Sequence, residues 1–404
     1  MTTATQIDLY SADTYAGAMP HDAFAALRRE SPVYRQSEAD GPGYWALLSY
    51  DDIVAVSGDN QLFSSARGGT NIDEMPPEAL AMIRTLMINM DPPRHTKYRR
   101  LVSTGFTPKI VRQLEPHVRA TTRRIVDGVA ARGQCDFVTE VAAQLPLAVI
   151  ADLIGVPEED RHKLFDWSNR LIGFDDPEFH TSPEDGQIAA TEMFVYAHGL
   201  ATERKQRPKS DLVSVLMGAE VDGESLTEAD FDGFFILLSV AGNETTRNLI
   251  SGAMLALIEH PEQRARLIAD PALITTAVEE FLRWVSPLIY FRRTLQRDVV
   301  VGGQQMREGD KVAMYYPSAN RDERAFENAH VFDVGRSPNA HLAFGGGGPH
   351  FCLGASLARL EIRCMFEELL LRLPDIELAG PVQRLRSNFI NGIKHMPVRY
   401  AQRA

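Results

Sequence analysis

The residues that could do chemistry are most concentrated around Cys352. This cysteine stands in the segment Phe-Gly-Gly-Gly-Gly-Pro-His-Phe-Cys-Leu-Gly, residues 344–354, and leucines recur at helical spacing in residues 353–365 directly after it. We therefore expect Cys352 at a helix N-terminus, where unpaired backbone N–H groups and the helix dipole favour a thiolate over a thiol. A thiolate placed in this way is a metal ligand or a nucleophile, whereas an isolated cysteine is more often a buried structural thiol.

A second polar group interrupts a long apolar segment. Thr227-Glu-Ala-Asp230 is typical of a capped helix start and no proline follows until Pro261, which predicts a helix of about 33 residues and about 50 Å. In its middle lies Ala241-Gly-Asn-Glu-Thr-Thr246. Glycine, an acid and threonines are unfavourable in an apolar helix, so this segment is either a simple bend or a functional acid and alcohol, Glu244 and Thr245.

Two further polar pairs have helical spacing. His95 and Arg99, four residues apart, follow Asp-Pro-Pro at the start of an expected helix, and Glu280 and Arg283 stand three apart in residues 277–284. Each pair lies on one face of its helix, so spacing alone is equally compatible with an ordinary solvated face.

Together and in this order, these motifs resemble those of the cytochrome P450 family, in which one cysteine thiolate holds the haem iron. The resemblance implies haem b as cofactor, with Cys352 as the axial ligand and with Phe344 and Gly354 in the haem-binding loop. Phe344 lies eight residues before Cys352, and most of the family has one residue fewer. The longer form is similar to that of actinobacterial members that hydroxylate sterols and methyl-branched lipids.

The resemblance also assigns roles to other residues. Thr245 and Glu244 match the alcohol and acid that manage oxygen and protons, although aspartate is commoner than glutamate at the second position. Around the haem propionates it places His95, Arg99, His350 and Arg293, with Arg292 less favoured than Arg293. A structural network is implied for Glu280, Arg283 and Arg336. For an apolar substrate pocket we name Leu237, Val240, Ala241, Leu288, Ile289, Phe291, Phe389 and Ile390.

The fold implied is mainly α with a minor β-sheet region, and haem would lie between the long central helix and the helix after the cysteine loop. Because there is no linker, repeat or low-complexity segment, residues 1–404 are expected to form one domain. Strands are expected at 44–48, 288–293 and 311–316, a hairpin at 298–306, and a helix beginning at residue 50. Residues 66–90 read as a long mobile loop, and residues 167–181 as a lid by resemblance only. Helices should fill 111–200, with breaks at Gly133, Pro146, Pro157 and Pro177.

Composition and charge indicate which partners and which cellular location to expect. The net charge of −12 argues against a nucleic-acid partner, and the most apolar stretch, residues 231–242, is too short to cross a bilayer. Three cysteines without paired spacing, and no signal-peptide pattern at the N-terminus, indicate a reducing, cytoplasmic location without membrane insertion. Residues 94–132 carry ten Lys or Arg against two acids, a local excess of eight positive charges.

The predicted activity is monooxygenation of an apolar small molecule, using O₂ and two electrons from an acidic iron-sulfur ferredoxin with its reductase. By resemblance the substrate is a sterol, a branched lipid or a similar molecule, and a terpenoid or small aromatic is the alternative. Three other hypotheses stay open: a peroxide-driven haem-thiolate enzyme, a haem-thiolate sensor without turnover, and a hydrolase with Cys352 as nucleophile.

Overall fold

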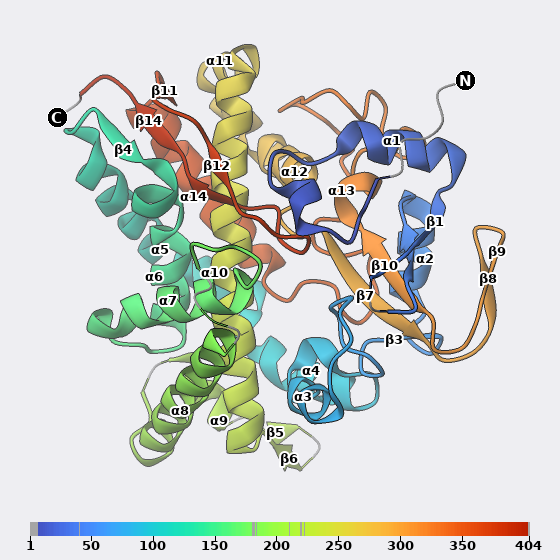
Figure 1. Cartoon of the computed structure of the whole chain (residues 1–404). Helices are drawn as coiled ribbons and strands as arrows, with labels where there is room; N and C mark the ends of the chain where they lie inside the picture. Colours follow the sequence, from blue (N-terminus) through green and yellow to red (C-terminus); the bar gives the residue numbers. More distant parts are fainter. Residues whose placement is uncertain are drawn as a thin grey trace.

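One helix, α10 (Glu228–Glu259), runs through the middle of the molecule, with a group of helices on one side and, on the other, a mixed sheet accompanied by further helices (Figure 1). The computed structural model describes residues 7–39, 41–179, 182, 184–209, 211–218, 220–221 and 223–402. Thr227 caps α10 by accepting from the Asp230 backbone N–H, while the Asp230 carboxylate accepts from the Thr227 N–H. The predicted capping box and helix length are therefore confirmed.

Helices make up most of the described chain, as predicted. They are α1 (His21–Glu30), α2 (Tyr50–Gly58), α3 (Pro77–Ile83), α4 (Arg94–Ser103), α5 (Pro108–Ala130), α6 (Gln144–Leu153), α7 (Arg161–Ile172), α8 (Asp185–Gln206), α9 (Leu212–Met217), α10, α11 (Pro261–Ala269), α12 (Ile274–Val285), α13 (Tyr316–Ala319) and α14 (Ala355–Arg372). No helix of the described residues is both long and apolar enough to cross a membrane.

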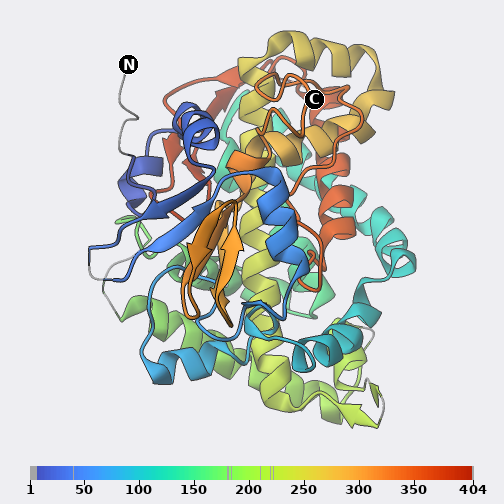
Figure 2. The same cartoon turned by 90° about the vertical axis from the view of Figure 1, so that its right-hand side faces the viewer.

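The largest sheet has the order β1-β2-β10-β7-β3 and faces the viewer in Figure 2. Its strands are β1 (Val33–Gln36), β2 (Tyr44–Leu47), β3 (Phe63–Ser64), β7 (Tyr290–Leu295) and β10 (Lys311–Tyr315). β2 and β10 are parallel and the other pairs are antiparallel.

Smaller sheets complete the β structure. They contain β4 (Gln134–Asp136), β5 (Glu220–Val221), β6 (Glu224–Ser225), β8 (Val299–Val301), β9 (Gln304–Met306), β11 (Glu377–Leu378), β12 (Gln383–Arg384), β13 (Ile393–His395) and β14 (Pro397–Arg399). The predicted hairpin is β8-β9, and both turn glycines, Gly302 and Gly303, have a positive φ that favours glycine.

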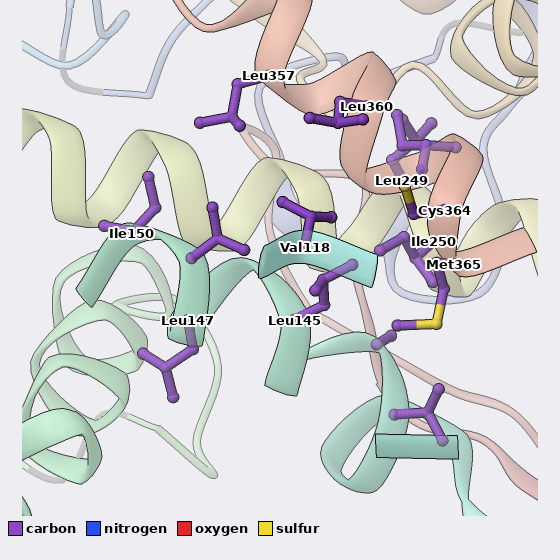
Figure 3. Packing of buried hydrophobic residues seen from close by; sticks show 14 of the residues in the cluster. Val118, Leu145, Leu147, Ile150, Leu249, Ile250, Leu357, Leu360, Cys364 and Met365 are labelled. Atoms are coloured by element: carbon purple, nitrogen blue, oxygen red, sulfur yellow. The ribbon is translucent and has the colours of Figure 1, made fainter. Parts of the chain in front are cut away.

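The main core forms where α10, α14, α5 and α6 meet (Figure 3). Ile250 of α10, Leu145 of α6 and Val118 of α5 are fully buried, and Leu360 and Cys364 of α14 are buried with them. This packing fixes the two helices that were expected to enclose the haem.

Two local predictions need correction. Residues 66–90 are not one loop, because α3 and a 3₁₀ turn at Met87–Asn89 lie within them. Pro77 starts α3 at a position where its missing N–H costs nothing, and the helix formers that follow propagate the turn. The predicted helix break at Pro146 is also wrong. Pro146 is the third residue of α6, a position where a backbone N–H has no intrahelical partner, so proline is tolerated there. The lid prediction lies partly outside the described residues, at positions 180 and 181.

Candidate active site

A cavity of about 420 Å³ lies between α10 and α14 and brings most of the predicted site residues together. Cys352, Phe344, Gly354, His95, Arg99, Arg293, His350, Glu244 and Thr245 all line it. These residues come from four separate parts of the chain, which the fold brings together.

Cys352 lines this cavity and is accessible from it. Its backbone N–H donates to the carbonyl oxygen of Phe344 at 3.0 Å, which closes the loop, and α14 begins three residues later at Ala355. Burial raises the pKa of the thiol, while the Gly354 N–H and the guanidinium groups of Arg99 and Arg359 act in the opposite direction. Burial therefore favours the thiol, and a bound metal cation would favour the thiolate instead.

The glycine run before Cys352 has a defined path. Gly345, Gly347 and Gly348 have positive φ angles, which other residues rarely adopt. A side chain at Gly346 or Gly348 would collide with Ser57 near the end of α2. The extra residue of this loop is therefore accommodated by left-handed glycines packed against α2.

Two arginines at the cavity, Arg293 buried and Arg99 half-buried, point to an anionic ligand. Arg293 is buried and donates only to the Arg292 carbonyl oxygen at 2.8 Å, and Arg99 donates to the Phe351 carbonyl oxygen at 2.6 Å. Neither guanidinium has a carboxylate partner among the described residues, and burial lowers the pKa of both. Because a buried charge is costly unless it is paired, these two arginines fit a ligand that carries carboxylates, as haem does.

Arg292 is not part of this group. Neighbouring residues of a strand point to opposite faces, and the Arg292 side chain lies on the other side of β7, paired with Glu74 at 3.3 Å. This placement favours Arg293 over Arg292 at the cavity.

Two histidines lie beside the arginines. The rings of His95 and His350 are 4.1 Å apart, and Nε2 of His350 lies 3.2 Å from the Ser65 hydroxyl. Burial, followed by the positive charge of Arg99, lowers the pKa of His95 to about 4. Nδ1 of His95 is buried without a protein partner, so it is free to bind a ligand that enters the cavity.

Comparison with known proteins decides the family. The cytochrome P450 family model matches residues 147–374. A steroid C26-monooxygenase of Rhodococcus jostii is 44% identical over 402 residues, 97% of this chain and 84% of that protein. This chain belongs to the cytochrome P450 family.

Other relatives agree. A methyl-branched lipid omega-hydroxylase of Mycobacterium bovis is 45% identical over 389 residues, 94% of the P450 described here and 90% of the relative. The structure of Mycobacterium marinum cytochrome P450 CYP268A2 in complex with pseudoionone matches with a TM-score of 0.92 and 41% identity, covering 98% of this chain and 99% of that one. This P450 is therefore a haem-thiolate monooxygenase with the mainly helical fold that the motifs predicted.

On the α10 side of the cavity, Glu244 binds Arg247 one turn further along the helix. Arg247 also donates to Asn169 Oδ1 of α7 at 2.8 Å. Burial raises the pKa of Glu244, Arg247 opposes the shift, and Oε1 of Glu244 is buried without a protein partner. The Thr245 hydroxyl donates to the Ala241 carbonyl oxygen at 2.6 Å, which leaves its oxygen lone pairs as acceptors.

Glu280, Arg283 and Arg336 lie together behind the cysteine loop. Arg283 and Glu280 form two hydrogen bonds of 2.7 Å with no side-chain exposure, and Arg336 Nε donates to the same carboxylate at 3.1 Å. Arg283 also donates to the carbonyl oxygens of Asn320 and Ala329, each at 2.8 Å. None of the three predicted network residues lines the cavity.

Of the predicted substrate residues, Leu237, Val240, Ala241, Leu288, Phe291, Phe389 and Ile390 line the cavity. Ile289 does not. Its side chain is fully buried in the cluster that contains Tyr290 and Tyr315. Adjacent residues of an extended chain face opposite ways, so with Leu288 toward the cavity Ile289 points away from it.

Sequence reasoning missed several lining residues. Glu361 lines the cavity from α14 together with Leu357 and Ala358, and helical spacing from Gly354 would have indicated all three. Burial raises the pKa of Glu361 to about 8, and its Oε2 has no protein partner. The apolar wall also contains Met75, Ile83, Leu86, Met87 and Ile88, which lie in the segment that the sequence presented only as a loop.

Proposed function

We propose that this P450 hydroxylates an apolar sterol or methyl-branched lipid, using electrons from an acidic ferredoxin. The observation that carries the proposal is the shared cavity: Cys352 and two arginines without a carboxylate partner among the described residues line it together with the acid and alcohol of α10. A sensor, a peroxide-driven enzyme or a cysteine hydrolase would need no such acid and alcohol beside a haem site.

In this proposal Cys352 would supply the thiolate ligand of a bound haem, and Arg99, Arg293, His95 and His350 would hold its propionates. When bound, haem supplies the binding and reductive activation of O₂. Oε1 of Glu244, the oxygen that Arg247 does not occupy, would accept a proton and pass it on at the cavity, and burial raises the pKa of this carboxyl, which favours the uptake. The Thr245 oxygen accepts a hydrogen bond on the cavity side because its own proton is directed to Ala241.

The remaining wall orients the substrate and excludes water. The lining of α10 and of the segment that follows α12 is apolar, including Leu237, Leu288 and Phe389. Apart from Glu361, the acidic and basic residues of the cavity are those assigned to haem or to proton transfer. Burial of apolar surface therefore supplies most of the binding free energy, which suits the steroid and branched-lipid substrates named for the relatives.

The electron donor is inferred from charge and position. Lys97, Arg100 and Pro349 line one surface groove, so positive residues of α4 lie next to the cysteine loop. Lys109 and Arg112 continue this basic surface at the start of α5 and are exposed. A negatively charged ferredoxin would be steered to this face, which is the side of Cys352. The reducing cytoplasm predicted from cysteine usage suits such a donor.

The test combines spectroscopy with turnover. The reduced carbon monoxide complex of the purified enzyme should show the long-wavelength Soret band of thiolate ligation, and with ferredoxin and its reductase the enzyme should hydroxylate a steroid or branched lipid. Cys352→Ser should lose the band, whereas Cys364→Ala, which removes a buried thiol of α14 that does not line the cavity, should retain it. Retention of the band in Cys352→Ser would refute the ligand assignment. Absence of any oxygenated product across both lipid classes would refute the substrate class.

A further inference from the structure

The cavity wall contains three neutral polar side chains from one segment, Thr70, Asn71 and Asn89. Thr70 and Asn89 are hydrogen-bonded to each other. The Thr70 hydroxyl donates to Asn89 Oδ1 at 2.9 Å, and Asn89 Nδ2 donates to the Ile83 carbonyl oxygen at 3.1 Å. Both the oxygen and the nitrogen of the Asn89 side-chain amide are therefore hydrogen-bonded, and Asn89 stabilises the segment that carries it.

Asn71 is engaged at one end only. Its Oδ1 accepts from the Tyr290 hydroxyl at 2.8 Å and from the Asp73 backbone N–H at 3.4 Å. The Tyr290 oxygen in turn accepts from the Ile72 N–H at 3.3 Å, so the tyrosine proton is the one shared with Asn71. Two donors at the same atom identify that atom as the oxygen of the amide. Nδ2 of Asn71, with two N–H groups, has no acceptor among the described residues.

The support for Asn71 is rigid. Tyr290 is fully buried, and its ring packs 5.4 Å from Phe389 and 5.8 Å from Tyr315. The backbone next to Asn71 is also held, since the Arg292 N–H donates to the Thr70 carbonyl oxygen at 2.8 Å. A donor fixed in this way loses little conformational entropy when it binds an acceptor.

The position of Asn71 differs from that of the haem-site residues. Tyr290 and Arg293 are three residues apart on β7, which corresponds to about 10 Å. Asn71 is anchored at the Tyr290 end, where Leu288, Phe389 and Ile390 provide apolar wall. Asn71 is thus held at the Tyr290 end of β7, which is about 10 Å along the strand from the residue that faces the haem site, Arg293.

The charges near Asn71 disfavour an anion. Asp73 and Glu74 follow directly, and the nearest cation, Arg292, is already paired with Glu74 at 3.3 Å. Lys311 is paired with Glu38 at 2.6 Å and with Glu74 at 3.3 Å. A carboxylate at Asn71 would meet two acids and no available cation, whereas a neutral oxygen would meet only the amide donor.

We propose that Asn71 determines specificity by donating a hydrogen bond to a neutral oxygen, a ketone or a hydroxyl group, of an otherwise apolar substrate. This inference rests on the proposed function, since it assumes an apolar lipid or steroid in the cavity. The oxygen is held at the Tyr290 end, and the opposite, hydrocarbon end of the molecule reaches Thr245. Asn71 therefore selects which end is hydroxylated.

The experiment uses the holoenzyme and two probes with one carbon skeleton, a 3-keto steroid that carries an apolar side chain and its 3-deoxy counterpart. Dissociation constants come from the substrate-induced spectral shift and from calorimetry. The wild-type enzyme should bind the keto probe about tenfold more tightly, the effect of one well-formed hydrogen bond to a neutral group. Asn71→Ala and Asn71→Asp should both remove this preference, and affinity for the deoxy probe should change little in Asn71→Ala.

Met75→Ala is the matched control, because it removes apolar wall from the same segment and should weaken both probes equally. Equal binding of both probes by the wild-type enzyme, or an equal loss for both probes in Asn71→Ala, would overturn the role of Asn71 and leave the substrate class intact. If the wild-type enzyme binds neither probe, the proposal that steroids are substrates is refuted, and the role assigned to Asn71 is refuted with it. A second readout is product regiochemistry, which should spread over more carbon atoms in Asn71→Ala than in Met75→Ala.

Discussion

Arg247 binds the carboxylate of Glu244 one turn away on α10, and both side chains are almost completely buried, at 5% and 1% exposure. The same guanidinium reaches Asn169 of α7. The acid that faces the cavity is thus held from within its own helix and tied to a neighbouring helix. A buried ion pair is weak evidence for stability, but removing one partner leaves an uncompensated charge.

Arg247→Met should therefore destabilise the fold by about 3–5 kcal/mol, because Glu244 would stay buried without its cation. The double variant Glu244→Gln with Arg247→Met should recover a large part of this loss, since it removes the unpaired charge. Denaturant unfolding of the wild-type enzyme and of the single and double variants measures the coupling free energy. If the loss of unfolding free energy in the double variant equals the sum of the losses in the two single variants, Glu244 and Arg247 have no specific coupling.

Thr245→Ala should lower the yield of hydroxylated product per electron consumed and increase hydrogen peroxide release. Substrate affinity should remain nearly unchanged, because the hydroxyl acts on oxygen and protons rather than on an apolar substrate. Thr245→Ser, which retains the hydroxyl bonded to Ala241, is the matched control and should stay largely coupled. The measurement is the ratio of product to reduced cofactor consumed, together with the spectral dissociation constant. An unchanged ratio in Thr245→Ala would exclude the proposed role.

Glu361 should make the enzyme less stable as pH rises. Burial raises the pKa of its folded-state carboxyl to about 8, whereas in the unfolded chain the group loses its proton near its ordinary value of about 4.3. Between these two pH values the folded state holds one more proton, so the free energy of unfolding falls with increasing pH, by a few kcal/mol at most. Glu361→Gln removes this penalty and should raise stability at about pH 8 but not at about pH 4.

Denaturant unfolding of the wild type and Glu361→Gln at both pH values tests this prediction. Glu368→Gln is the control on the same helix, where the change instead removes an ion pair with Arg372 at 3.5 Å. That variant should show no gain at the higher pH. A gain of Glu361→Gln that does not depend on pH would indicate a packing effect rather than a titration.

How far the sequence predicts this site depends on how local each signal is. The capping box of α10 and the glycine loop before Cys352 are short-range patterns, and the structure has both. The link from Arg247 to Asn169 joins residues 78 positions apart, and no pattern in either helix reveals it. Ile289 was misplaced for a different reason. Hydrophobicity alone does not say which face of an extended segment meets the cavity, and the strand period has to be applied residue by residue.

Reduction by ferredoxin should depend on the basic surface beside the cysteine loop. Lys109 and Arg112 are exposed near the start of α5, the helix that packs along α14. The double variant Lys109→Glu with Arg112→Glu should slow reduction by an acidic ferredoxin without altering substrate-induced spectral shifts, since neither residue lines the cavity. Exposed charges are screened beyond about 10 Å at 0.1 M salt, so the wild-type rate should fall as ionic strength rises and the rate of the variant should change much less.

Arg307→Glu provides the control for this experiment, because it reverses an exposed charge just after β9, on the side of the molecule opposite α5 (Figure 1). Stopped-flow reduction over a series of salt concentrations separates the effects, since steering by charge changes the association rate more than the bound complex. If Lys109→Glu with Arg112→Glu is reduced as fast as the wild type at low salt, while Arg307→Glu is slowed, the donor docks on the sheet side. Equal slowing by both variants would instead indicate a response to net charge alone.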